Sequence, residues 1–179
     1  MHQLLKPHMF VNSVSEIALD ALEKKGIRAL IIDLDNTITE WQDDRLSPEV
    51  LAWFSRLKTR GFCVCLVSNN KEKRVARVAQ VLDIPYIFKA TKPRRRAFRQ
   101  AMVILGTSPD ETAVIGDQIF TDVLGGNRLG LLTILVAPIS RREFIGTRLM
   151  RVIEGLIIRH FLKNHPCQQG TTSNENKFR

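Results

Sequence analysis

The sequence predicts an α/β fold with a central parallel sheet, and two observations carry that prediction. Short apolar runs alternate with longer stretches that have helical periodicity, as in repeated strand–helix units. Acidic or polar residues directly follow several of the apolar runs, which is typical of the edge of a parallel sheet where ligands bind. The 179 residues are 44% apolar and 25% charged, an ordinary composition for one domain with a substantial core.

The apolar runs predict five strands. They span residues 29–34, 62–67, 86–88, 112–115 and 132–136. Helix signals fill the stretches between them. Ser15 can cap a helix that stops at Gly26, and Ser47 with Pro48 begins a helix that stops before Gly61. Three further helices are expected over residues 71–82, 94–105 and 120–129.

After residue 138 the pattern changes. Residues 139–163 are basic and imperfectly amphipathic, which predicts a long helix, and from Asn164 the composition is that of a disordered tail. The expected organisation has four parts: residues 1–28 with one helix packing on the core, the core at 29–138, the basic helix at 139–163 and the tail at 164–179.

The formal net charge of +9 favours an anionic partner, which could be phosphate groups, nucleic acid or an acidic membrane surface. The first 12 residues lack the apolar core of a secretory signal, and no segment is long and apolar enough to span a bilayer. The three cysteines form no CxxC pair, which favours buried, reduced thiols. These features predict a cytoplasmic protein.

Two carboxylates, Asp33 and Asp35, end the first apolar run. Because they are two residues apart in an extended chain, they project to the same side and repel each other unless a cation or a shared proton relieves them. The pair therefore predicts a magnesium-dependent site with one nucleophilic carboxylate and one acid–base carboxylate.

Three more signals follow later runs. Ser68-Asn69 could hold phosphoryl oxygens, Lys92 could neutralise a phosphate, and Asp117 with Asp122 could complete an oxygen-rich magnesium shell. Each has a plain structural explanation when taken alone, as a turn, a helix cap or a solvated surface lysine. Their order and their placement after strands are what one phosphoryl-transfer site would require.

As an ordered set, the motifs resemble those of the haloacid dehalogenase (HAD) superfamily of aspartate-nucleophile phosphatases. The resemblance spans about residues 29–138 and rests on Asp33-Leu34-Asp35-Asn36-Thr37, Ser68, Lys92, and Gly116-Asp117 with Asp122. Residues 116–128, together with Leu5-Lys6-Pro7, are similar to the YqeG-type branch of subclass IIIA, whose relatives include mitochondrial phosphatidylglycerophosphate phosphatases.

The resemblance implies a Rossmann-like three-layer fold and a role for each motif residue. Asp33 would form an aspartyl-phosphate, and Asp35 would act as acid and then base. Ser68, Asn69 and Lys92 would bind the phosphoryl group. Magnesium would be bound by Asp33, the main-chain carbonyl of Asp35, Asp117 and Asp122, the last directly, through water or as outer support.

Segments 38–61 and 70–91 are too short to house a cap domain, so we expect a minimal (C0) cap and an open site. In this superfamily an open site goes with large or surface-presented substrates, or with closure by a second copy of the chain. Arginines at 94, 95, 96 and 99, and others in the C-terminal helix, fit an anionic lipid surface. The resulting hypothesis is a peripheral phosphatase acting on a phosphorylated lipid head group, with phosphatidylglycerophosphate as the leading candidate.

Two alternatives stay open. One is a phosphatase for a soluble metabolite or a phosphoprotein. The other is a non-catalytic module that binds nucleic acid or the ribosome, which the charge allows. It is not favoured, because Phe98 is the only aromatic residue among the basic residues of 92–99 and offers no evident stacking platform.

Overall fold

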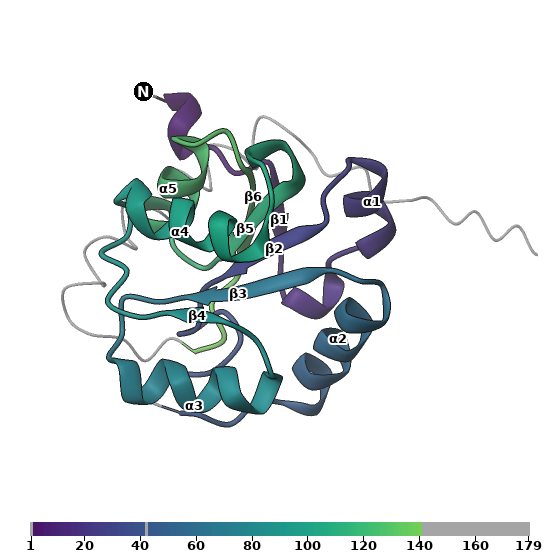
Figure 1. Cartoon of the computed structure of the whole chain (residues 1–179), viewed down its shortest axis with the longest axis vertical. Coiled ribbons are helices and arrows are strands. Elements are labelled where there is room, and N and C mark those ends of the chain that lie inside the picture. Colours follow the sequence, from purple (N-terminus) through teal and green to yellow (C-terminus); the bar gives the residue numbers. More distant parts are fainter. Residues whose placement is uncertain (1, 42, 141–179) are drawn as a thin grey trace, which may run out of the picture. The chain divides into compact units, whose positions relative to one another are not determined.

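The structure is a computed structural model that describes residues 2–41 and 43–140 (Figure 1). Within these residues six parallel strands form one sheet in the order β1-β6-β5-β2-β3-β4. The strands are β1 (Met9–Val11), β2 (Ala29–Ile32), β3 (Cys63–Val67), β4 (Tyr86–Ile87), β5 (Thr112–Gly116) and β6 (Leu132–Val136). The predicted α/β class is confirmed.

The sheet has one strand more than the sequence analysis expected. β1 pairs with β6, with Met9 opposite Ile134, and the backbone N–H of His8 donates to the carbonyl of Thr133 at 2.9 Å. β1 is only three residues long and lies at the edge, where Phe10 remains 45% exposed. Its apolar run, Met9-Phe10-Val11, is too short to identify a strand from the sequence.

Five α-helices and four shorter turns connect the strands within the described residues. The helices are α1 (Leu19–Lys24), α2 (Pro48–Thr59), α3 (Glu72–Leu82), α4 (Arg95–Leu105) and α5 (Leu124–Asn127). The turns are the 3₁₀ turns η1 (His2–Leu5), η2 (Val14–Glu16) and η3 (Pro109–Glu111), and the π-helical turn η4 (Ile119–Val123). Ser47 caps α2 as expected, since its hydroxyl accepts from the N–H of Val50.

Two of the predicted helices differ from the observed ones by more than one residue at an end. The helix expected from Ser15 is divided, because Ile17 is extended and α1 begins only at Leu19. The helix expected over residues 120–129 begins with the π-helical turn η4, and only its second half is α-helical.

The helices cover both faces of the sheet (Figure 1). On one face α1, α2 and α3 pack on β2, β3, β5 and β6 through a core that includes Leu22, Trp53 and Val75. On the other face α4 packs through Phe98 against Val114 and Cys65, and α5 lies beside it. Cys65 is buried, but Cys63 is exposed, so the expectation of buried thiols was wrong for Cys63.

No cap domain interrupts the described core. The chain between β2 and α2 is a loop, and the chain between β3 and β4 is α3 with its short connections. The basic helix and tail predicted for 139–179 fall almost wholly outside the described residues. Among the helices that the structure describes, none has both the length and the apolar character needed to cross a bilayer.

Candidate active site

The predicted site residues gather where the strand order of the sheet reverses. The chain runs from β2 outward through β3 to β4 and then returns to β5 on the other side of β2. Asp33 follows β2 and Asp117 follows β5, and the N–H of Asp33 donates to the carbonyl of Ile115 at 2.9 Å. Ligands of open α/β sheets bind at this switch point, outside the carboxyl ends of the strands.

Three carboxylates meet there. Asp33, Asp117 and Asp122 each offer an oxygen, these oxygens all lie within 4.8 Å of one another, and all three residues are buried. Buried like charges this close repel strongly unless a cation offsets them. A set of carboxylate oxygens is what Mg²⁺ prefers, so the residues present fit a magnesium ion.

Lys92 supplies one positive charge to this group. Its Nζ lies 2.7 Å from Asp33 Oδ1 and 2.6 Å from Asp122 Oδ1. Burial opposes the charge on Lys92, but Asp122 and Asp33 outweigh it and hold the pKa of Lys92 above its ordinary value. Burial also raises the pKa of Asp33 to about 7, opposed by Lys92 and reinforced by Asp122. Lys92 alone is therefore insufficient to keep Asp33 fully ionised at neutral pH.

The turn η4 and Gly116 fix the position of Asp122. Its Oδ2 accepts from the hydroxyl of Thr121 at 3.0 Å and from the N–H of Gln118 at 3.3 Å. A Cβ on Gly116 would overlap the Asp122 carboxyl group, so only glycine at this position leaves room for that carboxylate. Packing therefore explains the glycine of the Gly116-Asp117 motif, while Asp117 provides its carboxylate.

Asp35 lies on the same loop, but its side chain has other partners. Arg74 donates to Asp35 Oδ1 from Nη2 at 2.7 Å and from Nε at 3.0 Å, while the amide of Asn70 donates to Oδ2 at 3.0 Å. The Asp35 side chain is 19% exposed, against 8% for that of Asp33. Its carboxylate is thus the more accessible of the two.

Ser68 and Asn69 lie beside Lys92 at the end of β3. Ser68 is buried, and its hydroxyl accepts from the N–H of Asn70 at 3.2 Å. The Asn69 side chain bonds the backbone of Lys92, accepting from its N–H at 2.8 Å and donating to its carbonyl at 3.4 Å. The Asn69 amide thus positions the Lys92 loop, and its predicted contact with phosphate remains a prediction.

The sequence analysis missed Arg74. This residue is 9% exposed and lies on α3, one turn before Val78 on the buried side of the helix. A cation within the apolar stripe of a helix is a signal that could have found it, because a buried arginine requires an anionic partner.

A sequence model of the haloacid dehalogenase-like hydrolases matches residues 15–130. The chain belongs to this family. Two relatives of this haloacid dehalogenase-like hydrolase are described as phosphatases. "Probable phosphatase YqeG" of Bacillus subtilis is 40% identical over 85% of this chain and 88% of the relative. Phosphatidylglycerophosphate phosphatase 1 of Arabidopsis thaliana (chloroplastic/mitochondrial) is 26% identical over 90% of this chain, which spans only 49% of that enzyme.

Solved structures agree on the fold of this hydrolase. The cobalt-bound deoxy-D-mannose-octulosonate 8-phosphate phosphatase of Haemophilus influenzae superposes with a TM-score of 0.53 at 17% identity, over 75% of this chain and 89% of that one. Family membership and the phosphatase relatives together make the protein a phosphoric monoester hydrolase.

Proposed function

We propose that this hydrolase is a Mg²⁺-dependent phosphatase that works through an aspartyl-phosphate on Asp33. We propose further that its substrate is a phosphorylated lipid head group, with phosphatidylglycerophosphate as the first candidate. The observation that carries the reaction is the buried group of Asp33, Asp117, Asp122 and Lys92 at the switch point of the sheet.

Two displacements at phosphorus make up the reaction. A carboxylate oxygen of Asp33 attacks phosphorus, the bond to the leaving oxygen breaks, and Asp35 gives that oxygen its proton. Asp35 then takes a proton from the water that attacks the aspartyl-phosphate, the bond from phosphorus to Asp33 breaks, and inorganic phosphate leaves. Ser68 and Lys92 hold the phosphoryl oxygens through both steps.

Asp33, Asp117 and Asp122 would bind the magnesium ion, with the main-chain carbonyl of Asp35 as a further oxygen ligand. When bound, Mg²⁺ supplies positive charge to the Asp33 carboxylate and to the phosphoryl oxygens. The raised pKa of Asp33 supports this proposal, because a buried nucleophile that must be ionised needs a cation beside it.

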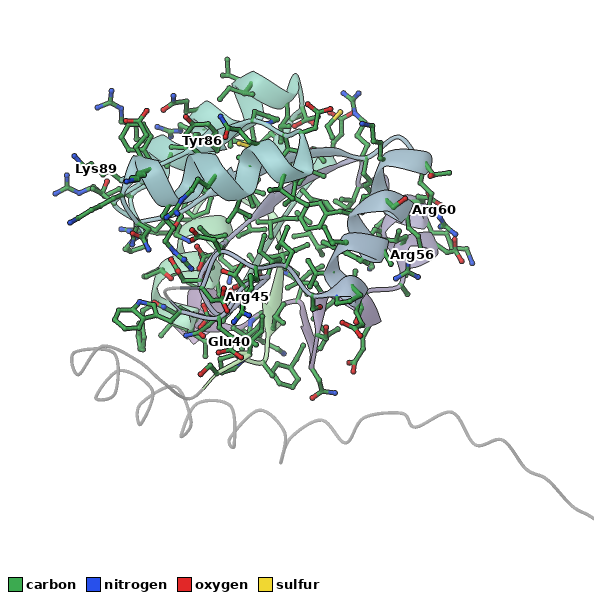
Figure 2. All side chains as sticks on the ribbon, turned by 90° about the horizontal axis from the view of Figure 1, so that it is seen from below. Glu40, Arg45, Arg56, Arg60, Tyr86 and Lys89 are labelled. Carbon is green, nitrogen blue, oxygen red and sulfur yellow. The ribbon has the colours of Figure 1, made fainter. Side chains whose placement is uncertain are left out.

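The distribution of charge supports an anionic surface as the place of action. Six exposed cations follow β3 and β4 in the connections and first helical turns on the side of the site, and we call them the basic rim: Lys71, Lys73, Lys89, Arg94, Arg95 and Arg96. Within the described residues none of them forms an ion pair. By contrast, Arg28, Lys58 and Arg60, at the opposite edge of the sheet, each pair with a carboxylate. Figure 2 shows Lys89 on one side of the described core and Arg56 and Arg60 on the opposite side.

Unpaired cations around an uncapped site suit a substrate presented by an acidic membrane, where each cation near the surface contributes about 1 kcal/mol. The plant relative's name adds support for phosphatidylglycerophosphate. The protein would then act as a peripheral enzyme on the cytoplasmic side of a membrane.

The test is a phosphate-release panel with and without Mg²⁺. The panel contains phosphatidylglycerophosphate in mixed vesicles, sugar phosphates, phosphoserine and a phosphopeptide. We expect Mg²⁺-dependent release that is fastest from the vesicles. Asp33→Asn should abolish turnover without unfolding the protein, whereas Asp110→Asn, which removes an exposed carboxylate at the far edge of the sheet, should leave it intact.

Different outcomes separate the parts of the proposal. Release from soluble phosphates but not from vesicles would reject the lipid substrate and keep the phosphatase. Wild-type rates from Asp33→Asn would reject the assigned nucleophile. A salt-sensitive shift on RNA without any phosphatase activity would favour the nucleic-acid alternative.

A further inference from the structure

Arg74 is a buried cation on α3 that links the predicted acid–base residue, Asp35, to later positions of the same loop. Besides its two bonds to Asp35, its Nη1 lies 2.6 Å from Asp44 Oδ1. Its Nη2 also donates to the carbonyl of Glu40 at 3.0 Å and to the hydroxyl of Thr39 at 3.2 Å. The guanidinium therefore joins α3 to the loop that carries Asp35.

The geometry leaves Arg74 little capacity for a substrate. Nε, Nη1 and Nη2 all have acceptors within the protein, and the Arg74 side chain is only 10% exposed. A direct contact with a phosphoryl group would require several of these bonds to break. Any influence of Arg74 on catalysis therefore passes through the groups that it bonds, and Asp35 is the predicted acid–base residue among them.

Both oxygens of Asp35 are occupied by donors, Oδ1 by Arg74 and Oδ2 by Asn70. Two N–H groups of the guanidinium converge on Oδ1 while the Asn70 amide holds Oδ2, so the direction of the carboxylate is fixed at both oxygens. An ammonium group in place of the guanidinium does not offer this planar pair of donors. A proton donor or acceptor works only within hydrogen-bond reach of the reacting oxygen, so the direction of this carboxylate matters to both displacements.

We propose that Arg74 is a positioning residue for Asp35, holding its carboxylate in the direction needed to protonate the leaving oxygen and then to deprotonate water. The inference rests on the acid–base role proposed for Asp35. The contacts also allow a second role for Arg74, which is to hold the loop in place through Asp44 without affecting the direction of the Asp35 carboxylate.

Arg77 offers a matched control. It lies one turn further along α3 and pairs with Asp44 Oδ2 at 2.7 Å, but it makes no contact with Asp35. A variant of Arg77 weakens the fastening of the loop and leaves the donors of Asp35 in place. The two arginines thus separate loop anchoring from carboxylate positioning.

The acid role of Asp35 can be measured by comparing two substrates whose leaving groups differ in their need for a proton. An alkyl phosphate has a poor leaving group that needs a proton, whereas p-nitrophenyl phosphate releases a stable anion that does not. For Arg74→Met we expect kcat/KM on an alkyl phosphate, which reports only the steps up to release of the leaving group, to fall by at least about tenfold, within the 10²- to 10⁴-fold range typical of acid–base catalysis. We expect a much smaller fall in kcat/KM on p-nitrophenyl phosphate, whereas kcat includes hydrolysis of the shared aspartyl-phosphate and can fall on both substrates. Asp35→Asn should show the same selectivity, and the double variant should be no slower than Asp35→Asn alone.

Arg77→Met should show no such selectivity. Arg74→Lys, which keeps the charge but loses the planar pair of donors, should fall between wild type and Arg74→Met, and it carries the same test if Arg74→Met does not fold. Equal losses of kcat/KM on both substrates for the Arg74 variants, or additive losses in the double variant, would overturn the inference. If instead wild type shows no Mg²⁺-dependent turnover, or if Asp35→Asn lacks the selectivity, the proposed function itself fails.

Discussion

At the scale of single residues, the charge on Asp33 depends on its surroundings more than on its own chemistry. Burial beside Asp122 raises its pKa from 3.8 to about 7, and Lys92 only partly opposes the rise. In the unfolded chain Asp33 ionises near its ordinary value. Folding without a metal therefore favours the protonated form of this carboxyl group.

The sign of the resulting pH dependence follows from linkage. The contribution of Asp33 to stability is fully present below pH 4 and is lost as the pH rises through about 7. For the metal-free protein we predict that the free energy of unfolding falls over this interval by on the order of 4 kcal/mol more in wild type than in Asp33→Asn. Urea unfolding in the presence of a chelator, at pH 5 and pH 8, measures the part of this fall that lies between the two pH values, about 3 kcal/mol.

The Asp33→Asn variant also loses the contact between Lys92 and the Asp33 carboxylate. Because the comparison uses the change in the free energy of unfolding between two pH values, any pH-independent effect of that loss cancels. Mg²⁺ should restore stability at pH 8 in wild type and much less in Asp33→Asn. Asp110→Asn is the control and should follow wild type at every pH. Parallel pH profiles for wild type and Asp33→Asn would show that burial does not perturb this carboxyl group.

At the scale of elements, α4 and α5 approach each other closely beneath the site. A Cβ on Gly125 would overlap the ring of Phe98, which is fully buried against the sheet. We predict that Gly125→Ala lowers the free energy of unfolding by about 1–3 kcal/mol, the usual cost of overpacking. Adding Phe98→Leu, which removes the ring, should make the double variant more stable than the sum of the single changes. Denaturant unfolding tests this, and strict additivity would contradict it.

Several elements and site residues could be predicted because their signals are local. β6 was predicted with its observed bounds, and Asp33, Asp117 and Ser68 each come directly after an apolar strand. Parallel strands present their carboxyl ends at one edge of the sheet, so chain order alone brings these residues together.

The helical pattern could have marked Arg74 as a buried cation, but no local signal identified Asp35 as its partner. The contact depends on the path of the loop after Asp35, where Asn36 adopts a left-handed backbone conformation with φ 58° and its N–H donates to the carbonyl of Thr39. No periodic pattern marks such a path. The π-helical turn η4 was missed for a related reason. Its start at Ile119 places Asp122 against Lys92, so the turn is explained by the contacts of the site more than by the helix preferences of its residues.

At the scale of the whole molecule, the basic rim gives the carboxyl edge of the sheet a different surface from the amino edge. Lys89 and Arg94 belong to the rim, whereas Lys24 and Lys25 are exposed at the end of α1, near the start of β2. Removing two positive charges from either place changes the net charge equally. If the site faces an acidic membrane, only the removal of charges from the basic rim should weaken membrane binding.

We predict that Lys89→Gln with Arg94→Gln weakens binding of the full chain to vesicles rich in anionic lipid by roughly 20- to 30-fold, from about 1 kcal/mol for each cation. Lys24→Gln with Lys25→Gln should have little effect. Vesicle flotation measures binding, and raising the salt concentration should reduce the difference between the two variants. Equal weakening by both pairs would mean that net charge, not the rim, governs the attraction.

The pairing of β1 with β6 also bears on how the molecule is made. β1 leaves the ribosome well before its partner strand, which ends at Val136. The Asn127 amide, which donates to the carbonyls of Leu4 and Lys6, is likewise made long after these two residues. β1 therefore stays without its partner while the intervening strands are made, and an unpaired strand edge is prone to wrong partners. Since Asp122 comes only shortly before β6, a nascent chain has no complete catalytic group until the sheet is nearly ready to close.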